Sequence, residues 1–183
     1  MSAKSTSERY GSVAIAIHWL TAAAILGLLV SGAIIEDMRD PAQKVALLRV
    51  HVVVGVTVLV LTLFRIVWWG VVDRRPAATT STPRWQAFAA HLVHGLLYVV
   101  IIVMVGSGIG MIALSGAADT LFGGGSAALP DFRDYAPRGA HGLGANAMWL
   151  LVIVHVLAAL YHQFVLRDRL LARMGLGRTQ QRI

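Results

Sequence analysis

The stretch "WLLVIVHVLAALYHQF", Trp149–Phe164, is almost wholly apolar and yet carries two imidazoles, His155 and His162. It lies within a longer run, Gly139–Leu166, that contains no charged residue. An α-helix needs about 20 apolar residues to cross the hydrocarbon core of a bilayer. The run therefore predicts a membrane-spanning helix, and its histidines predict polar groups inside the membrane.

Three further segments have the same character. Gly11–Ile35 and Trp85–Ala118 contain no charged residue, and Val50–Phe64 is bracketed by Arg49 and Arg65. The long stems of such arginines reach toward the membrane interfaces, and the apolar extension "IVWWGVV" gives this third run spanning length.

The whole composition agrees with a membrane protein. Of the 183 residues 57% are hydrophobic and 14% are charged, with a mean hydropathy of +0.69. We predict an all-α fold, an integral membrane antiparallel four-helix bundle in a single domain over residues 1–183. The expected helices span about 12–35, 45–69, 85–114 and 140–167.

The first apolar run is not interpreted as a signal peptide. It is longer than the apolar region of such peptides, no clear small-residue cleavage site ends it, and it carries His18. The chain has no cysteine, so it can form neither disulfides nor thiolate metal sites.

The net charge of +7 is explained by its distribution and does not point to nucleic acid. Basic residues gather on the segments that would face the cytoplasm if both termini are cytoplasmic, eleven against five outside. The inner set is Lys4, Arg9, Arg65, Arg74, Arg75, Arg84, Arg167, Arg169, Arg173, Arg178 and Arg182, and the outer set is Arg39, Lys44, Arg49, Arg133 and Arg138.

Histidines are the main functional signal. Ionisable side chains are costly in a bilayer, so each is a functional-site hypothesis. Fourteen residues, close to four turns, separate His141 from His155, which places both on one helix face about 21 Å apart. His162 continues that stripe. All seven histidines lie within or at the edge of an expected span: His18, His51, His91, His94, His141, His155 and His162.

Paired imidazoles in an apolar bundle favour haem held by two histidines. Zinc sites and proton relays usually include Asp, Glu or Cys, and none is available at depth. Two haems stacked across the membrane need four ligands in two layers. Depth places His51 with His141 in an outer layer, and His155 with His18 in an inner one. Counting leaves two alternatives open: His91 or His94 as the partner of His155, and His162 as the partner of His18.

The chain resembles the bacterial cytochrome b561 family, four-helix di-haem cytochromes of inner membranes. The resemblance covers nearly the whole chain. It rests on four motifs taken in order: "AIHWLTA", "RVHVVVGVTVLVLTLFRIVWW", "AAHLVHGLLYVVIIVMVGSGIGM" and "HVLAALYHQFVLRDRLLARM".

This resemblance implies a ligand set and a substrate. It implies that His18 and His155 ligate the inner haem b, and that His51 and His141 ligate the outer one. It further implies a quinone headgroup near two cytoplasmic-side residues, and it gives His91 no role beyond a structural one. The two quinone residues it implies are His94 and His162.

Two groups of cations have two interpretations each. Arg49 and Arg65 either pair with haem propionates or extend to lipid phosphate. The five outer cations either attract an anionic donor or are offset by neighbouring acidic residues.

The leading functional hypothesis, implied by the resemblance, is electron transfer from a periplasmic one-electron donor, superoxide, through two haems to ubiquinone. The alternative is a cytochrome subunit that anchors a periplasmic dehydrogenase or redox protein and relays its electrons. A haem-free histidine transporter is the third hypothesis, and it requires a colourless protein. The expected location is the bacterial inner membrane, and no catalytic residue is assigned.

Overall fold

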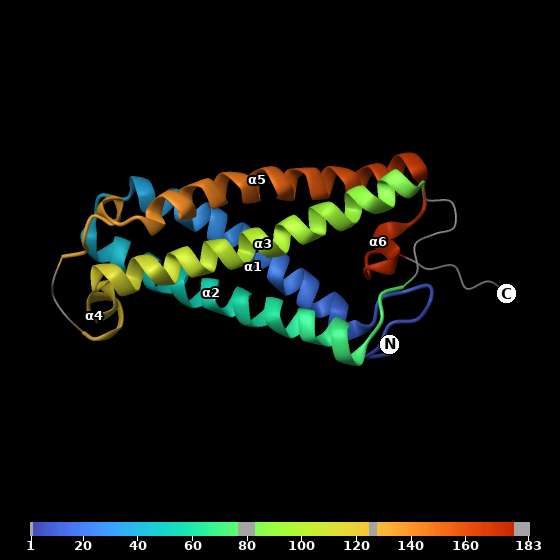
Figure 1. The fold of residues 1–183 in the computed structure, drawn as a ribbon, viewed down its shortest axis with the longest axis horizontal. Coiled ribbons are helices and arrows are strands. Elements are labelled where there is room, and N and C mark those ends of the chain that lie inside the picture. Colours follow the sequence, from blue (N-terminus) through green and yellow to red (C-terminus); the bar gives the residue numbers. More distant parts are fainter. Residues whose placement is uncertain (1, 77–82, 125–127, 178–183) are drawn as a thin grey trace.

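Helices make up the fold. The computed structural model describes residues 2–76, 83–124 and 128–177, and these ranges contain helices and no strand. The four long helices are α1 (Ser12–Asp37), α2 (Pro41–Val67), α3 (Arg84–Ser115) and α5 (Pro137–Tyr161). They run antiparallel to their chain neighbours along one axis (Figure 1). The all-α four-helix architecture expected from the sequence is confirmed.

Two of the long helices are continued by a π-helical turn. The turn η1 (Trp68–Val72) follows α2, and η3 (His162–Leu166) follows α5. With these turns, all four segments are long and apolar enough to cross a membrane.

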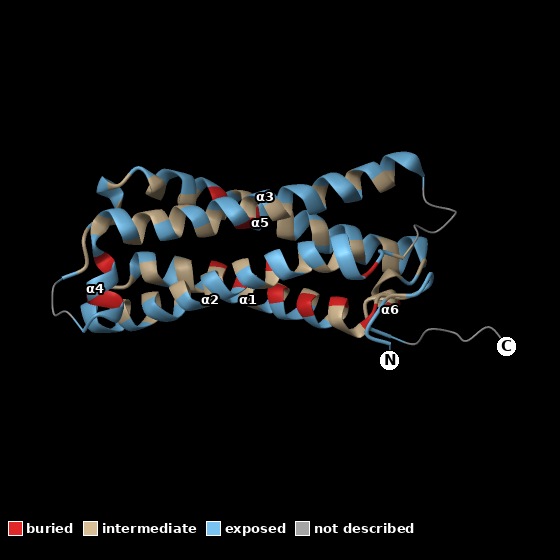
Figure 2. Ribbon diagram, turned by 60° about the horizontal axis from the view of Figure 1, so that its bottom comes forward, coloured by how far each residue is buried: buried red, intermediate tan, exposed pale blue. Residues whose placement is uncertain are grey.

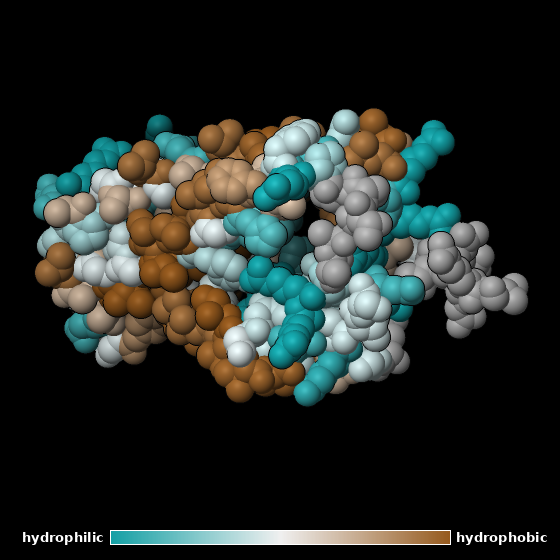
Figure 3. All heavy atoms as spheres, turned by 45° about the vertical axis from the view of Figure 1, so that its right-hand side comes forward, coloured by the Kyte–Doolittle hydropathy of each residue, from teal (hydrophilic) through white to brown (hydrophobic). Residues whose placement is uncertain are grey.

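The outer faces of these helices are apolar and exposed. Leu20, Val60 and Leu150 are each about three-fifths exposed, as are many other large apolar side chains of the bundle. Figure 3 shows apolar atoms over the long helices and hydrophilic atoms toward the ends. A protein in water would bury such a surface, so these faces are suited to lipid.

Helix ends follow local chemistry. Asp40 caps α2, since its side chain accepts a hydrogen bond from the Gln43 N–H at 3.0 Å, and Pro41 occupies the first helical position. The helix therefore begins four residues before the expected Val45. At the end of α3, Gly116 adopts the left-handed conformation with φ 69°, which a glycine adopts without strain.

The described part of the outer connection contains more helix than its glycine-rich sequence suggests. It contains α4 (Ala117–Phe122) and the short 3-10 helix η2 (Phe132–Asp134). Leu121 of α4 is fully buried, and its carbonyl accepts a hydrogen bond from Arg49 Nε. We call this end of the bundle the outer end and the opposite end the inner end.

The long helices form two layers. Helix α1 packs against α2, and α3 packs against α5 (Figure 2). The buried core contains one residue from each long helix: Leu29, Val58, Ile101 and Met148. Met148 lies seven residues from both His141 and His155, so this apolar core lies midway between the two histidine levels.

Two short segments lie at the inner end of the bundle. The N-terminal segment and the short helix α6 (Leu170–Arg173) both lie there (Figure 1). The Trp19 indole N–H donates to the Met174 carbonyl at 3.0 Å, which ties α1 to the segment after α6. Ser5 donates its N–H and hydroxyl to the Asp73 carboxylate, which ties the N-terminus to the end of α2.

Candidate functional site

The outer pair of histidines lies between the two helix pairs, α1 with α2 and α3 with α5. His51 comes from α2 and His141 from α5, and their ring centroids lie 6.4 Å apart at an interplanar angle of 58°. Glycines lie beside both rings: a Cβ at Gly32 would lie 3.5 Å from the His51 ring and one at Gly108 would lie 3.4 Å from the His141 ring, both in ordinary van der Waals contact.

Hydrogen bonds fix which nitrogen of each outer ring carries the proton. His141 Nδ1 lies 3.0 Å from the Met104 carbonyl, which can only accept, so this nitrogen donates. His51 Nδ1 lies 2.9 Å from Ser31 Oγ, whose own hydrogen goes to the Leu28 carbonyl. Both rings therefore carry the proton on Nδ1, and both Nε2 lone pairs are left for a metal ion.

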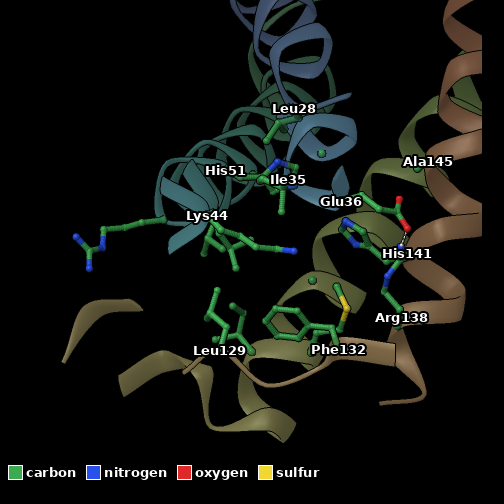
Figure 4. A pocket seen from close by; sticks show the side chains of 18 of the residues that line it. Leu28, Ile35, Glu36, Lys44, His51, Leu129, Phe132, Arg138, His141 and Ala145 are labelled. Atoms are coloured by element: carbon green, nitrogen blue, oxygen red, sulfur yellow. Dashed lines mark hydrogen bonds and ion pairs between the residues drawn. The ribbon is translucent and has the colours of Figure 1, made fainter. Parts of the chain in front are cut away.

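A cavity of about 1420 Å³ opens beside this layer. His51 and His141 line it from different sides, and Glu36 pairs with Arg138 at 3.0 Å near them (Figure 4). The five outer basic residues all line it, against the two acidic residues Glu36 and Asp131. The five are Arg39, Lys44, Arg49, Arg133 and Arg138.

The inner histidine layer contains three imidazoles instead of two. His18 of α1 and His155 of α5 have ring centroids 6.2 Å apart at 58°. His94 of α3 lies closer to His155, at 5.2 Å and 75°. Its Nδ1 lies 2.7 Å from the Ala90 carbonyl and so carries the proton.

A guanidinium distinguishes the inner layer. Arg65 Nη1 lies 3.4 Å from His18 Nδ1, and Arg65 Nε is buried without a hydrogen-bond partner. A guanidinium only donates, so this contact places the His18 proton on Nε2. Binding of a metal through Nε2 therefore requires Arg65 or the ring to turn, and an anionic group near Arg65 would favour that change.

The distance between the two rings of each histidine pair suits haem. Metal–imidazole bonds are about 2 Å long, so two imidazoles on opposite sides of one ion have centroids roughly 6 Å apart. The pairs His18–His155 and His51–His141 fit this distance, whereas His94 lies too close to His155. In the described part of the chain, no three His, Asp or Glu side chains gather as a metal site. Two-ligand pairs suit an ion whose other four ligands come from a macrocycle.

The remaining expected site residues have separate hydrogen-bond partners. None of the described contacts joins His94 to His162, whose Nδ1 instead donates to the Asp168 carboxylate. His91 Nδ1 donates to the Ala87 carbonyl at 2.6 Å, and this is its one described hydrogen bond.

Sequence reasoning missed the residues that orient the rings. Ser31 and Ser107 both contact a ring Nδ1, the latter at 3.1 Å from His141. Their presence within apolar spans was a usable signal, because a hydroxyl in a membrane interior needs a hydrogen-bond partner. Asp168 was also missed, since it lies in the basic segment after the last span.

Comparison with known proteins identifies the family of the chain. The prokaryotic cytochrome b561 family matches residues 9–177. Cytochrome b562 of Cereibacter sphaeroides is 36% identical over 170 residues, covering 90% of this chain and 94% of the relative. A Yersinia pestis protein named "Probable superoxide oxidase CybB" is 27% identical over 173 residues, covering 91% and 96%. Cytochrome b561 homolog 1 of Escherichia coli K12 is 26% identical over 177 residues, covering 91% and 97%. No solved structure matches the chain.

The chain belongs to the prokaryotic cytochrome b561 family. It is an integral membrane b-type cytochrome, which implies haem b and electron transfer across a membrane. The family resemblance expected from the four motifs is thereby confirmed.

Proposed function

We propose that the chain carries electrons through two haems from a periplasmic one-electron donor, superoxide, to ubiquinone. The observation that carries this proposal is the presence of two histidine pairs, 6.2 and 6.4 Å apart, one toward each end of the bundle. A bound haem iron supplies one-electron chemistry by alternating between its ferric and ferrous states.

The residues of this chain have the following roles. His51 and His141 would hold the outer haem through Nε2, and His18 and His155 would hold the inner one. Arg65 would pair with an anionic propionate of the inner haem, which its unpartnered Nε supports. The apolar core at Leu29 and Met148 keeps water out between the two layers.

Superoxide as the donor is supported by charge. The outer cavity is lined by five basic and two acidic side chains, an excess of positive charge that attracts a small anion. The name of the Yersinia pestis relative is in agreement. Two superoxide ions each lose one electron to become dioxygen, while one ubiquinone gains two electrons and two protons to become ubiquinol.

Ubiquinone is placed at the inner end, near His94 and His162, because an imidazole can both donate a hydrogen bond and supply a proton. The proposed orientation puts this end at the cytoplasmic face of a bacterial inner membrane, with both termini there. The excess of basic residues at this end supports it.

The test uses purified protein that contains haem, with superoxide generated enzymatically and a short-chain ubiquinone as acceptor. We expect haem reduction and ubiquinol formation, both abolished by superoxide dismutase. Haem that stays oxidised under a superoxide flux overturns the donor assignment. Reduced haem that is not reoxidised by the quinone overturns the acceptor assignment.

A second candidate is a membrane anchor that relays electrons from a periplasmic dehydrogenase or redox protein. The exposed apolar side chains Leu114 and Phe122 at the outer end favour a docking role. A periplasmic protein that co-purifies in mild detergent and reduces the haem directly would support it.

A further inference from the structure

The turn that follows α5 has an unusual backbone. Asp168 lies between Arg167 and Arg169, which have φ values of 55° and 59° in the left-handed region. This conformation costs a residue with a side chain roughly 1–2 kcal/mol, and glycine is its usual occupant. Strain of this kind persists where the surrounding structure enforces it, and it is frequent at functional sites.

The turn holds a carboxylate against an imidazole. Asp168 Oδ2 accepts a hydrogen bond from His162 Nδ1, and the Asp168 N–H donates to the His162 carbonyl at 3.3 Å. His162 is also the first residue of the π-helical turn η3, a feature that often marks functional sites. With Nδ1 directed to the carboxylate, Nε2 is left to face a substrate, as in other imidazole–carboxylate pairs.

Capping of α6 does not account for this arrangement. Arg169 is the N-cap residue of α6 and makes no side-chain cap hydrogen bond, while the Leu170 N–H donates to Asp168 Oδ1 at 3.2 Å, which leaves Oδ2 unused by the helix start. The second oxygen is therefore available for His162. The helix α6 that follows the turn is tied to the N-terminal segment, because the Tyr10 N–H donates to the Arg173 carbonyl at 3.3 Å.

The pair lies between lipid and water. Tyr161 and Phe164, which flank His162, are 48% and 67% exposed and so face the hydrocarbon in a membrane. Asp168 lies beyond Leu166, where the spanning segment ends. The His162 and Asp168 side chains are 20% and 15% exposed, so the pair is shielded without being sealed.

We propose that His162 and Asp168 form the proton-transfer pair for quinone reduction, with Asp168 as the positioning residue. This inference rests on the proposed quinone acceptor. The quinone takes two electrons, delivered singly by two equivalents of the one-electron donor, and two protons. For each proton, His162 starts with both ring nitrogens protonated, and its Nε2–H bond breaks as the reduced quinone oxygen takes the proton, which leaves a neutral ring. Water at the inner face reprotonates the ring while Asp168 holds Nδ1–H.

The test follows the reoxidation of reduced haem by decylubiquinone in stopped flow, at a series of quinone concentrations. In Asp168→Asn we expect the maximal rate to fall at least tenfold, while the half-saturating quinone concentration changes less than threefold. Asp168→Glu, which keeps the carboxylate, is expected to recover a large part of the rate. The haem spectrum and the rate of haem reduction by the donor should stay unchanged, which shows that each variant is assembled.

Asp73→Asn is the matched control. Asp73 is also a carboxylate after a π-helical turn at the inner end, but its partners are Ser5, Arg74 and the Trp68 indole. In Asp73→Asn the rate of haem reoxidation by decylubiquinone should stay within twofold of the wild type. A loss equal to that of Asp168→Asn overturns the proposal, because it would show a general effect of charge at this end.

A double variant tests whether the two residues act together. His162→Gln should slow reoxidation as much as Asp168→Asn, and the combination should be no slower than His162→Gln alone. If the fold-losses of the two single variants multiply in the double variant, the proposed pair is overturned. It is also overturned if Asp168→Asn lowers Tm but leaves the rate of haem reoxidation by the quinone normal. If wild-type haem is not reoxidised by the quinone at all, the acceptor assignment fails first, and the pair fails with it.

Discussion

The outer and inner histidine layers use the same kind of side chain in different surroundings. In the outer layer, Nδ1 of His51 and of His141 faces neutral acceptors, a serine hydroxyl and a backbone carbonyl. In the inner layer, His18 faces the Arg65 guanidinium, and His155 has a third imidazole, His94, against it. The outer cation Arg138 is paired with the Glu36 carboxylate. Arg65 has no acidic partner among the residues that the structure describes.

This difference separates two ways of building a site. The outer layer is oriented by the chain itself, because its ring protons are fixed by acceptors on the helices. The inner layer contains the half-buried Arg65, whose Nε has no hydrogen-bond partner, so we expect an anionic ligand to complete this layer. A guanidinium beside a metal ligand also favours the less positive, reduced metal.

The largest expected effect comes from removing a ligand from either layer. His51→Ala should halve the haem content per chain and leave the inner haem spectrum, and His155→Ala should do the converse. His91→Ala is the control, since His91 bonds within its own helix. Haem per chain is measured by pyridine haemochrome, and retention of both haems in His51→Ala would remove the outer pair from the proposal.

A smaller effect, on a haem midpoint potential, is expected from replacing Arg65. Arg65→Gln should lower the midpoint potential of one haem by on the order of 60 mV, a tenfold change for one electron, because the reduced form loses a stabilising charge. Spectroscopic redox titration measures both haems in one sample. Arg138→Gln should move the outer potential less, since Glu36 already offsets that charge. Equal shifts in the two variants contradict the asymmetry between the layers.

Two serine variants test whether hydrogen bonds to Nδ1 orient the rings of the outer layer. Ser31→Ala removes the described acceptor of His51 Nδ1 and should speed haem loss up to about tenfold. Ser107→Ala should have a weaker effect, because the Met104 carbonyl still accepts from His141. Transfer of haem to an acceptor protein gives both rates, and identical rates would show that these hydrogen bonds do not orient the rings.

The smallest effect concerns Asp73 at the inner end, outside the spans. Burial raises the pKa of Asp73, but hydrogen bonds from Ser5, Arg74 and Trp68 outweigh it and hold the pKa below the ordinary 3.8. A depressed folded-state pKa gives stability that is present above pH 3.8 and is lost as the pH falls through the folded value. Asp73→Asn should therefore lower Tm by about 2–4 °C at pH 7 and by less near pH 3. An equal difference at both pH values would contradict this origin.

The sequence by itself determined the spans and the depth of the histidines. A charge-free apolar run in a bilayer has no stable form except a helix, because every backbone N–H and C=O needs a partner within the segment. Four such runs in succession predict an antiparallel bundle. A 14-residue spacing then places His141 and His155 at two levels of one face, whatever the packing.

Tertiary structure alone decided which imidazoles meet and what orients them. Helix rotation is set by packing, so counting could not choose between His18 and His94 as the neighbour of His155; both lie beside it, at different distances. The acceptors Ser31 and Met104 come from other helices than the rings they orient. The Asp168–His162 contact depends on two left-handed arginines that no propensity predicts. Such contacts join positions whose relative placement depends on side-chain packing, which is why a linear pattern does not contain them.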